Sequence, residues 1–211
     1  MKPHEKITII FDFGRVLVDW DPRYLYRKLL PDEQAIENFL KEVHFFEWVT
    51  LQDAGRPMAD TVDEWCQRYP QYCDLLQAYN QRYPETISGP IAGTVEILRC
   101  LKAAGFPVWG LSNWPLEKFR QLEHQFEFFN WLDGKVISGE VRLAKPDPAI
   151  FHLLLQQAGR QAQDCLLIDD SRTNIAAAQE LGFQTILFQS PQQLQNELFQ
   201  YTGLSFAAMP C

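Results

Sequence analysis

Short apolar runs alternate with longer amphipathic stretches along most of this chain, and this alternation limits the folds open to it. Five runs are apolar enough to form strands buried on both faces: residues 7–12, 108–113, 135–138, 165–170 and 185–188. Parallel strands have this character because helices cover both faces of their sheet. Helical patterns that end beside glycine separate the runs; they cover residues 91–105, 148–158 and 174–181. Strands that alternate with helices predict an α/β fold with a doubly wound parallel sheet.

The segment between the first and second runs breaks this alternation. Residues 20–88 are rich in Trp, Phe and Tyr and contain helical patterns without a convincing strand. Asp21-Pro22 and Pro31-Asp32 are helix-start signals, because each pairs an acidic cap residue with a proline. A chain of 211 residues is long enough for an α/β core with a smaller insertion. We therefore expect a core made of residues 1–19 and 89–211, and a small all-helical cap at 20–88 inserted after the first strand.

Charge and hydropathy argue against two classes of partner. The formal net charge is −8 and no Lys/Arg-rich run is present, whereas binding to a nucleic-acid backbone requires a basic face. The apolar stretch before Asp12 is too short for a signal core or a membrane span. We therefore expect a cytoplasmic protein that binds small, diffusible molecules, with no nucleic-acid or membrane partner.

The cysteines suggest the same compartment. They are odd in number and scattered, with no CxxC pair, which argues against a disulfide framework or a zinc site. We expect all of them to be free thiols in a reducing cytoplasm: Cys66, Cys73, Cys100, Cys165 and Cys211.

Polar residues follow four of the predicted strands. In an open parallel sheet, ligands bind beyond the carboxyl ends of the strands, so these residues should meet at one edge. The set contains carboxylates, a hydroxyl, an amide and an ammonium group, which together suit a hard cation and a phosphate. Its members are Asp12, Ser112, Asn113, Lys145, Asp169 and Asp170.

Each of these residues, taken singly, has a second interpretation. Asp12 also suits a turn or cap, and Ser112-Asn113 and Asp169-Asp170 also suit the caps of the helices that follow them. Lys145, which precedes a proline, also suits a solvated loop. Their order and spacing along the chain favour one shared site.

Four segments resemble, in order, the four motifs of the haloacid dehalogenase superfamily. They are FDFGRVLVDWDP (11–22), LSN (111–113), AKPDPAIF (144–151) and LIDDSRTNIAAAQELG (167–182). The resemblance implies a Rossmann-like core and, between the first two motifs, the α-helical cap of subfamily IA. The chain looks most similar to sugar-1-phosphate phosphatases of bacteria and to the phosphatase domain of soluble epoxide hydrolases.

The resemblance also implies how the carboxylates work. Asp12 would be the nucleophile and would form an aspartyl-phosphate that water then hydrolyses. Asp12, Asp170 and the backbone carbonyl of Gly14 would bind Mg²⁺, and Asp169 would orient the site from behind. Asn174 lies where many relatives have another acidic residue.

The remaining motif residues would bind the phosphoryl group. Ser112 and the Asn113 backbone would hold its oxygens, and Lys145 would neutralise the charge that the phosphate and the nucleophile bring together. The predicted activity is that of a magnesium-dependent phosphatase for a small phosphorylated metabolite, with sugar 1-phosphates as candidate substrates.

One position departs from the family pattern. Most phosphatases of the superfamily have a general acid two residues after the nucleophile, where this chain has Gly14. General acid–base catalysis contributes roughly 10²–10⁴-fold in rate, so we expect a preference for leaving groups that need little protonation: anomeric, acyl or aryl phosphates. Asp19 or Asp21 is a candidate substitute for the missing acid, although Asp21 also suits a helix cap. Arg15 either reaches a substrate anion or is solvated.

Aromatic residues near these motifs have two interpretations. Trp20, Phe45, Phe46 and Trp48 either line a pocket for a sugar or aryl group or form the cap's own core. Trp114 is the better candidate for lining the site, because it directly follows the second motif.

Two other functions remain open. A 2-haloacid dehalogenase uses the same aspartate on carbon and needs no metal, but an Asp169-Asp170 pair without a cation would repel the nucleophile. A catalytically weak, phospholigand-binding relative is the second alternative, and Gly14 is the observation that favours it.

Overall fold

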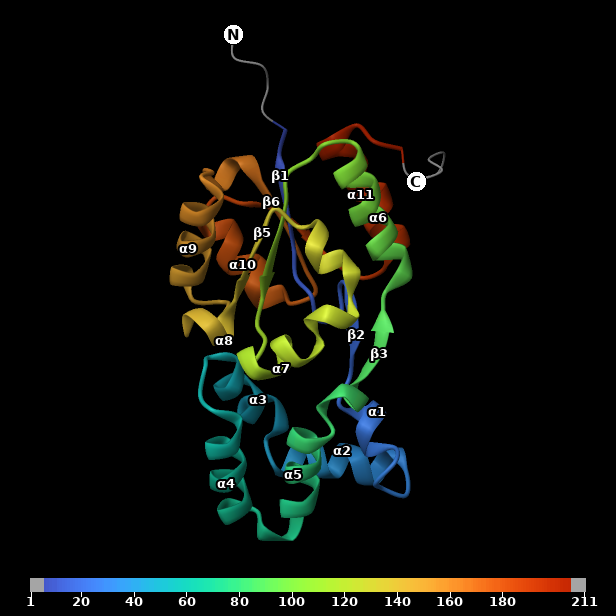
Figure 1. The fold of residues 1–211 in the computed structure, drawn as a ribbon, viewed down its shortest axis with the longest axis vertical. Coiled ribbons are helices and arrows are strands. Elements are labelled where there is room, and N and C mark those ends of the chain that lie inside the picture. The colour runs from blue at the N-terminus through green and yellow to red at the C-terminus, as the bar shows by residue number, and fades with distance from the viewer. Residues whose placement is uncertain (1–5, 206–211) are drawn as a thin grey trace.

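The computed structural model describes residues 6–205, and its centre is a five-stranded sheet with strand order β5-β4-β1-β6-β7 (Figure 1). All neighbouring strands are parallel. The strands are β1 (Thr8–Phe11), β4 (Val108–Ser112), β5 (Gly134–Ile137), β6 (Cys165–Asp169) and β7 (Gln184–Leu187). Each of the five predicted apolar runs overlaps one of them, so the predicted parallel sheet is confirmed.

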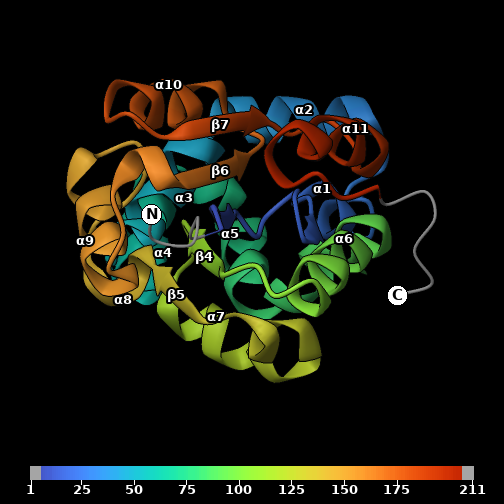
Figure 2. The same cartoon turned by 90° about the horizontal axis from the view of Figure 1, so that it is seen from above.

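Helices cover both faces of the sheet (Figure 2). Successive side chains of a strand point to opposite faces: Ile9 and Phe11 pack with α6 and α11, whereas Ile10 packs with α9 and α10. All three side chains are fully buried. The core helices are α6 (Ala92–Ala103), α7 (Leu116–Leu122), α8 (Ser138–Val141), α9 (Pro148–Ala158), α10 (Arg172–Glu180) and α11 (Pro191–Thr202). The doubly wound α/β fold is the one expected from the sequence.

A helical unit lies beyond the carboxyl ends of the strands, at the bottom of Figure 1. It contains α1 (Arg23–Tyr26), α2 (Glu33–Glu42), α3 (Phe45–Asp53), α4 (Met58–Arg68) and α5 (Cys73–Gln81). The acidic residues of both predicted start signals accept backbone hydrogen bonds: Asp21 from the N–H of Arg23 at 2.9 Å and Asp32 from the N–H of Ala35 at 2.8 Å.

An antiparallel ribbon joins this helical cap to the core. Its strands are β2 (Val18–Trp20) and β3 (Ile87–Pro90). The ribbon was not among the predicted strands, because three and four residues are too few to show an alternating pattern.

Most of the cap's aromatic residues pack against one another. Phe45 and Trp48 are fully buried in the cap, and the indole of Trp48 donates to the carbonyl of Thr61 at 3.1 Å. Phe46, in contrast, is 46% exposed on the surface. For Phe45 and Trp48 the cap-core interpretation is therefore the right one.

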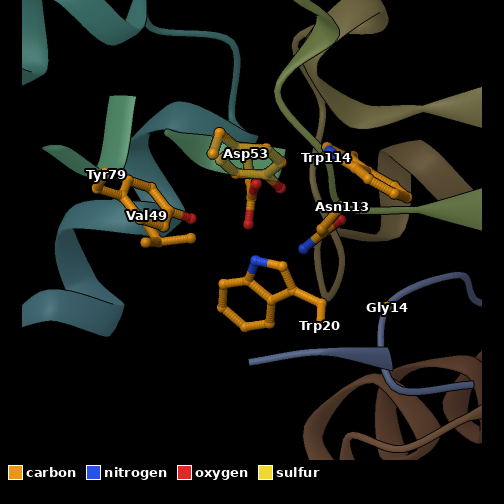
Figure 3. A pocket seen from close by; sticks show the side chains of 8 residues that line it. Gly14, Trp20, Val49, Asp53, Tyr79, Asn113 and Trp114 are labelled. Atoms are coloured by element: carbon orange, nitrogen blue, oxygen red, sulfur yellow. The ribbon is translucent and has the colours of Figure 1, made fainter. Parts of the chain in front are cut away.

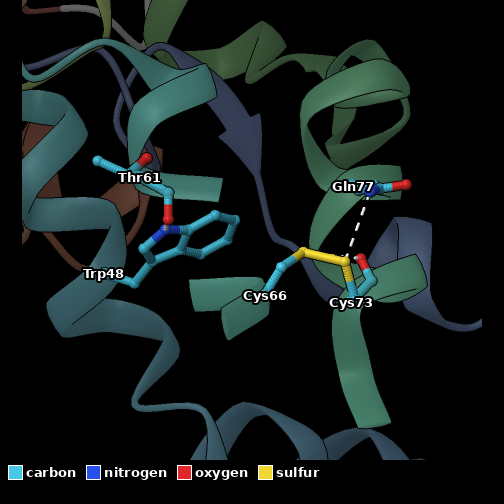
Figure 4. The surroundings of a disulfide bond; sticks show 5 residues. All are labelled: Trp48, Thr61, Cys66, Cys73 and Gln77. Atoms are coloured by element: carbon cyan, nitrogen blue, oxygen red, sulfur yellow. Dashed lines mark hydrogen bonds between the residues drawn. A yellow bond between two sulfur atoms is a disulfide. The ribbon is translucent and has the colours of Figure 1, made fainter. Parts of the chain in front are cut away.

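A disulfide joins Cys66 at the end of α4 to Cys73 at the start of α5 (Figure 4). The prediction of free thiols is wrong for this pair, because the turn between the two helices brings the sulfur atoms together. Because these two cysteines are bonded to each other, the cysteines no longer argue for a reducing compartment. Cys165 is a buried free thiol, while Cys211 and residues 1–5 lie outside the described residues.

Among the helices of residues 6–205, none combines the length and the apolar character needed to cross a bilayer.

Candidate active site

Three carboxylates meet where β1 and β6 end. Asp12 follows β1, Asp169 is the last residue of β6, and Asp170 follows it. One oxygen from each lies within 4.8 Å of the others. Asp12 and Asp169 are buried and Asp170 is partly exposed. The convergence predicted from strand order is therefore present in the fold.

Lys145 is the cation inside this carboxylate cluster. Its ammonium nitrogen lies 3.0 Å from Asp12 Oδ1 and 2.6 Å from Asp169 Oδ2, and it donates to the Leu111 carbonyl at 2.8 Å. These acceptors match the three protons of an ammonium group. Only 3% of Lys145 is exposed, so the solvated-loop interpretation is wrong.

The second motif positions Lys145 from the neighbouring strand. The side-chain amide of Asn113 donates to the Lys145 carbonyl and accepts from the Lys145 N–H, each at 2.8 Å. Ser112, the last residue of β4, is 1% exposed, and its hydroxyl has no partner among the described residues. Neither side chain caps α7. A buried hydroxyl without a partner at this edge indicates a place for a ligand oxygen.

Asp169 accepts hydrogen bonds from several neighbours besides Lys145. Its Oδ1 accepts from the backbone N–H of Ser171 at 2.8 Å, and the Asn174 amide donates to both of its oxygens at 3.0 and 3.1 Å. The side chain of Ser171, and not an aspartate, caps α10. Asn174 therefore stabilises the charge of Asp169, which an acidic residue in its place would not do.

The cluster has three carboxyl groups and a single ammonium group, so negative charge is in excess. Burial raises the pKa of Asp12 to about 7; Lys145 opposes this shift, and Asp169 and Asp170 add to it. Burial and then Asp169 likewise raise the pKa of Asp170. Burial alone would lower the pKa of Lys145, but Asp12 and Asp169 outweigh it, so the net shift is upward. Clustered, partly desolvated carboxylate oxygens with one ammonium fit a hard divalent cation such as Mg²⁺.

Two adjoining cavities open beside the carboxylates, and Gly14, Trp20 and Asn113 line both. The polar cavity, of about 220 Å³, is also lined by Asp12, Arg15, Asp170 and Ser171. The second cavity, of about 70 Å³, reaches into the cap and is also lined by Val49, Asp53, Tyr79, Tyr83 and Trp114 (Figure 3).

Several expected residues therefore lie at the site, and others do not. Trp20 and Trp114 line the cap-side cavity. Arg15 is exposed; its guanidinium group lies 3.9 Å from Asp170 and over the Trp20 ring. Asp19 accepts from the hydroxyl of Tyr24 at 2.8 Å. Asp21 accepts from the backbone N–H of Arg23 just before α1 and pairs with its guanidinium group.

Sequence reasoning missed Asp53, Tyr79 and Tyr83. Asp53 is the last residue of α3. The signal in the sequence was weak: an acidic residue that ends an aromatic-rich helix without belonging to any motif.

Curated relatives share the sequence pattern. A sesquiterpene phosphatase of Aspergillus oryzae is 31% identical over 82% of this chain and 85% of its own length. Bifunctional epoxide hydrolase 2 of Rattus norvegicus is 23% identical over 85% of this chain, and a drimenol cyclase of Aspergillus calidoustus is 29% identical over 46% of it. The chain spans 32% of the epoxide hydrolase and 18% of the cyclase, so it matches one part of each of these longer proteins.

Solved structures share the fold. A haloacid dehalogenase family enzyme of Bacteroides thetaiotaomicron, in complex with magnesium and inorganic phosphate, superposes with a TM-score of 0.66 at 19% identity. The match covers 88% of this chain and 95% of that one. The model of the haloacid dehalogenase-like hydrolases matches residues 8–182. With its parallel sheet, inserted cap and motif residues gathered at one edge, this chain is a member of the haloacid dehalogenase-like hydrolase family.

Proposed function

We propose that the chain is a magnesium-dependent phosphatase that hydrolyses small phosphate monoesters through an aspartyl-phosphate on Asp12. The observation that carries this proposal is the carboxylate cluster of Asp12, Asp169 and Asp170, with the Lys145 ammonium between the first two. An aspartate nucleophile needs nearby positive charge, because a phosphate dianion otherwise repels it.

The residues that would hold Mg²⁺ are Asp12, Asp170 and the backbone carbonyl of Gly14, all of which line the polar cavity. When bound, the ion neutralises phosphoryl oxygens and keeps the carboxylates ionised. Asp169, which is bonded to Lys145, Ser171 and Asn174, keeps the cluster in place.

Asp12 is oriented for attack by its own hydrogen bonds. Oδ1 accepts from the N–H of Phe13 at 2.7 Å and lies 3.0 Å from the ammonium of Lys145. These contacts fix the plane of the carboxylate through one oxygen. An oxygen of this fixed carboxylate forms the bond to phosphorus, while the charge of Lys145 offsets that of the phosphoryl group and the unpartnered hydroxyl of Ser112 holds a phosphoryl oxygen.

The cap-side cavity holds the leaving group. The indoles of Trp20 and Trp114 and the phenols of Tyr79 and Tyr83 line it, and each carries a polar hydrogen-bonding group, which favours a leaving group that carries oxygen atoms. Sugar 1-phosphates satisfy this requirement better than the terpenoid phosphates that the name of the Aspergillus oryzae relative suggests.

A phosphate-release screen over sugar phosphates, nucleotides and aryl phosphates, with and without Mg²⁺, tests the proposal. Hydrolysis should require Mg²⁺, stop with a chelator, and disappear in Asp12→Asn. The matched control is Asp164→Asn, because Asp164 is an exposed aspartate away from the site; this variant should keep full activity.

Two outcomes would overturn the proposal. Activity that survives in Asp12→Asn would mean that another group is the nucleophile. Activity on a 2-chloroacid that is undiminished by the chelator would mean that the protein is a dehalogenase.

A further inference from the structure

The proposed reaction lacks a proton donor in the core domain. An alkoxide leaving group needs a proton as its bond to phosphorus breaks, and position 14 has no side chain to supply one. A Cβ atom built on Gly14 would have no atom within 4 Å, so the space beside the nucleophile is open.

Nearby carboxylates of the core and ribbon are already engaged. Asp19 accepts from Tyr24, Asp21 accepts from and pairs with Arg23, and Asp170 pairs with Arg15 beside the nucleophile. The two sequence-based candidates, Asp19 and Asp21, also line neither of the two cavities.

Asp53 is differently placed. It ends α3, which contacts α8 of the core, and its carboxyl group points into the cap-side cavity between Trp20 and Asn113 (Figure 3). It lines this cavity together with Gly14. No hydrogen bond or ion pair to Asp53 occurs within residues 6–205. A carboxyl group without a partner therefore faces the gap that glycine leaves beside the nucleophile.

We propose that Asp53, delivered by the cap, is the general acid and base of this enzyme; the role rests on the proposed phosphatase function. As an oxygen of Asp12 bonds to phosphorus, the bond between phosphorus and the leaving oxygen breaks. Its electron pair stays on that oxygen, which takes the proton of Asp53. In the second half, the Asp53 carboxylate takes a proton from the water that attacks phosphorus. The Asp12–phosphate bond breaks, and both groups return to their starting state.

The surroundings of Asp53 favour the protonated form that this step requires. Burial raises the pKa of Asp53 to about 7, the negative charge of Asp12 adds to the shift, and Lys145 opposes it. The titratable groups that face Asp53 across the cavity are the phenols of Tyr79 and Tyr83. Burial places their pKa values well above the usual 10, so both are neutral and neither competes as a charge.

Two substrates that differ in their need for a proton test the role. p-Nitrophenyl phosphate releases a stable anion, whereas benzyl phosphate releases an alkoxide. Asp53→Asn should lower kcat/KM for benzyl phosphate by roughly 10²–10⁴-fold and change that for p-nitrophenyl phosphate only a few-fold. Gly14 by itself predicts that the wild-type enzyme prefers leaving groups that need little protonation. If Asp53 supplies the proton, this preference should instead appear in Asp53→Asn. Asp63→Asn, which changes an exposed cap aspartate on α4, should affect neither substrate.

A rescue experiment separates a chemical role from a structural one. Gly14→Asp should restore benzyl phosphate hydrolysis in the Asp53→Asn background, because position 14 has room for a side chain and its backbone lies outside the left-handed region. Equal losses on both substrates, or no loss on benzyl phosphate, would overturn the role of Asp53. A wild-type protein inactive on both substrates would instead overturn the proposed function.

Discussion

The two halves of the site are built in opposite ways. On the core side, the buried charged groups form ion pairs and hydrogen bonds with one another. Lys145 contacts two carboxylates and a carbonyl, and Asp169 accepts from Lys145, Ser171 and Asn174. On the cap side, aromatic rings surround one carboxyl group, Asp53, that has no partner within the described residues.

This difference indicates that the core side and the cap side of the site have different catalytic roles. Buried charges that satisfy one another are held in one geometry, which suits the precise alignment that attack on phosphorus requires. A carboxyl group in a largely aromatic wall has a raised pKa and so carries a proton more readily at neutral pH, which suits a proton donor. The core side would therefore serve the phosphoryl group, and the cap side the part of the substrate that leaves.

The largest effect should come from removing the central cation of the core side. Lys145→Met leaves Asp12 and Asp169 buried without their counter-ion, and breaking a buried ion pair in this way costs about 3–5 kcal/mol of unfolding free energy. Urea denaturation of the metal-free protein measures it.

Lys118→Met is the control for this prediction. Lys118 is also buried, but it donates to the carbonyl of Asn80 and pairs with Glu117 at 3.7 Å, outside the carboxylate cluster. If both variants lose the same stability, the core side is not the tightly coupled unit described above.

A smaller effect should come from opening the cap disulfide. The Cys66–Cys73 bond closes a loop with a sequence separation of seven, and a loop this short predicts a loss of about 2 kcal/mol in Cys66→Ser/Cys73→Ser. Because the bond lies between α4 and α5 and away from the cavity lining, kcat should stay within two- to three-fold of wild type, on the order of the scatter of distant substitutions. A large fall in kcat at unchanged stability would show that the far end of the cap controls the site.

The smallest effect should be a pH dependence of stability that Asp53 contributes. Its pKa is about 7 in the folded protein, against an ordinary value of 3.8, so the folded state binds more protons between these values. Its contribution is complete below about pH 4 and is lost as pH rises through 7. Between pH 6 and 8 the loss is about 1 kcal/mol for a group of this kind.

Thermal unfolding in chelator at both pH values measures this contribution. Wild type should lose more stability than Asp53→Asn between pH 6 and pH 8. Asp12 is present in both proteins, so a difference between their profiles results from the removal of the Asp53 carboxyl group. Identical pH profiles would show that Asp53 is ionised like a surface carboxylate.

The sequence by itself determined the strands, the helices of the core and the edge at which the motif residues gather. Apolar runs and helical periodicity are local signals, and the carboxyl ends of parallel strands share one edge, so Asp12, Lys145 and Asp169 were predictable as neighbours. The cap's helical nature was readable for the same reason.

Only the tertiary structure decided how the cap meets that edge. The short ribbon, the burial of Lys145 and the Cys66–Cys73 bond depend on contacts that spacing along the chain does not record. Above all, Asp53 belongs to no motif, and it comes to face Gly14 because α3 lies against α8. Contacts of this kind arise where segments distant in the sequence pack together. That packing depends on the complementary shapes of whole surfaces and not on a local sequence pattern.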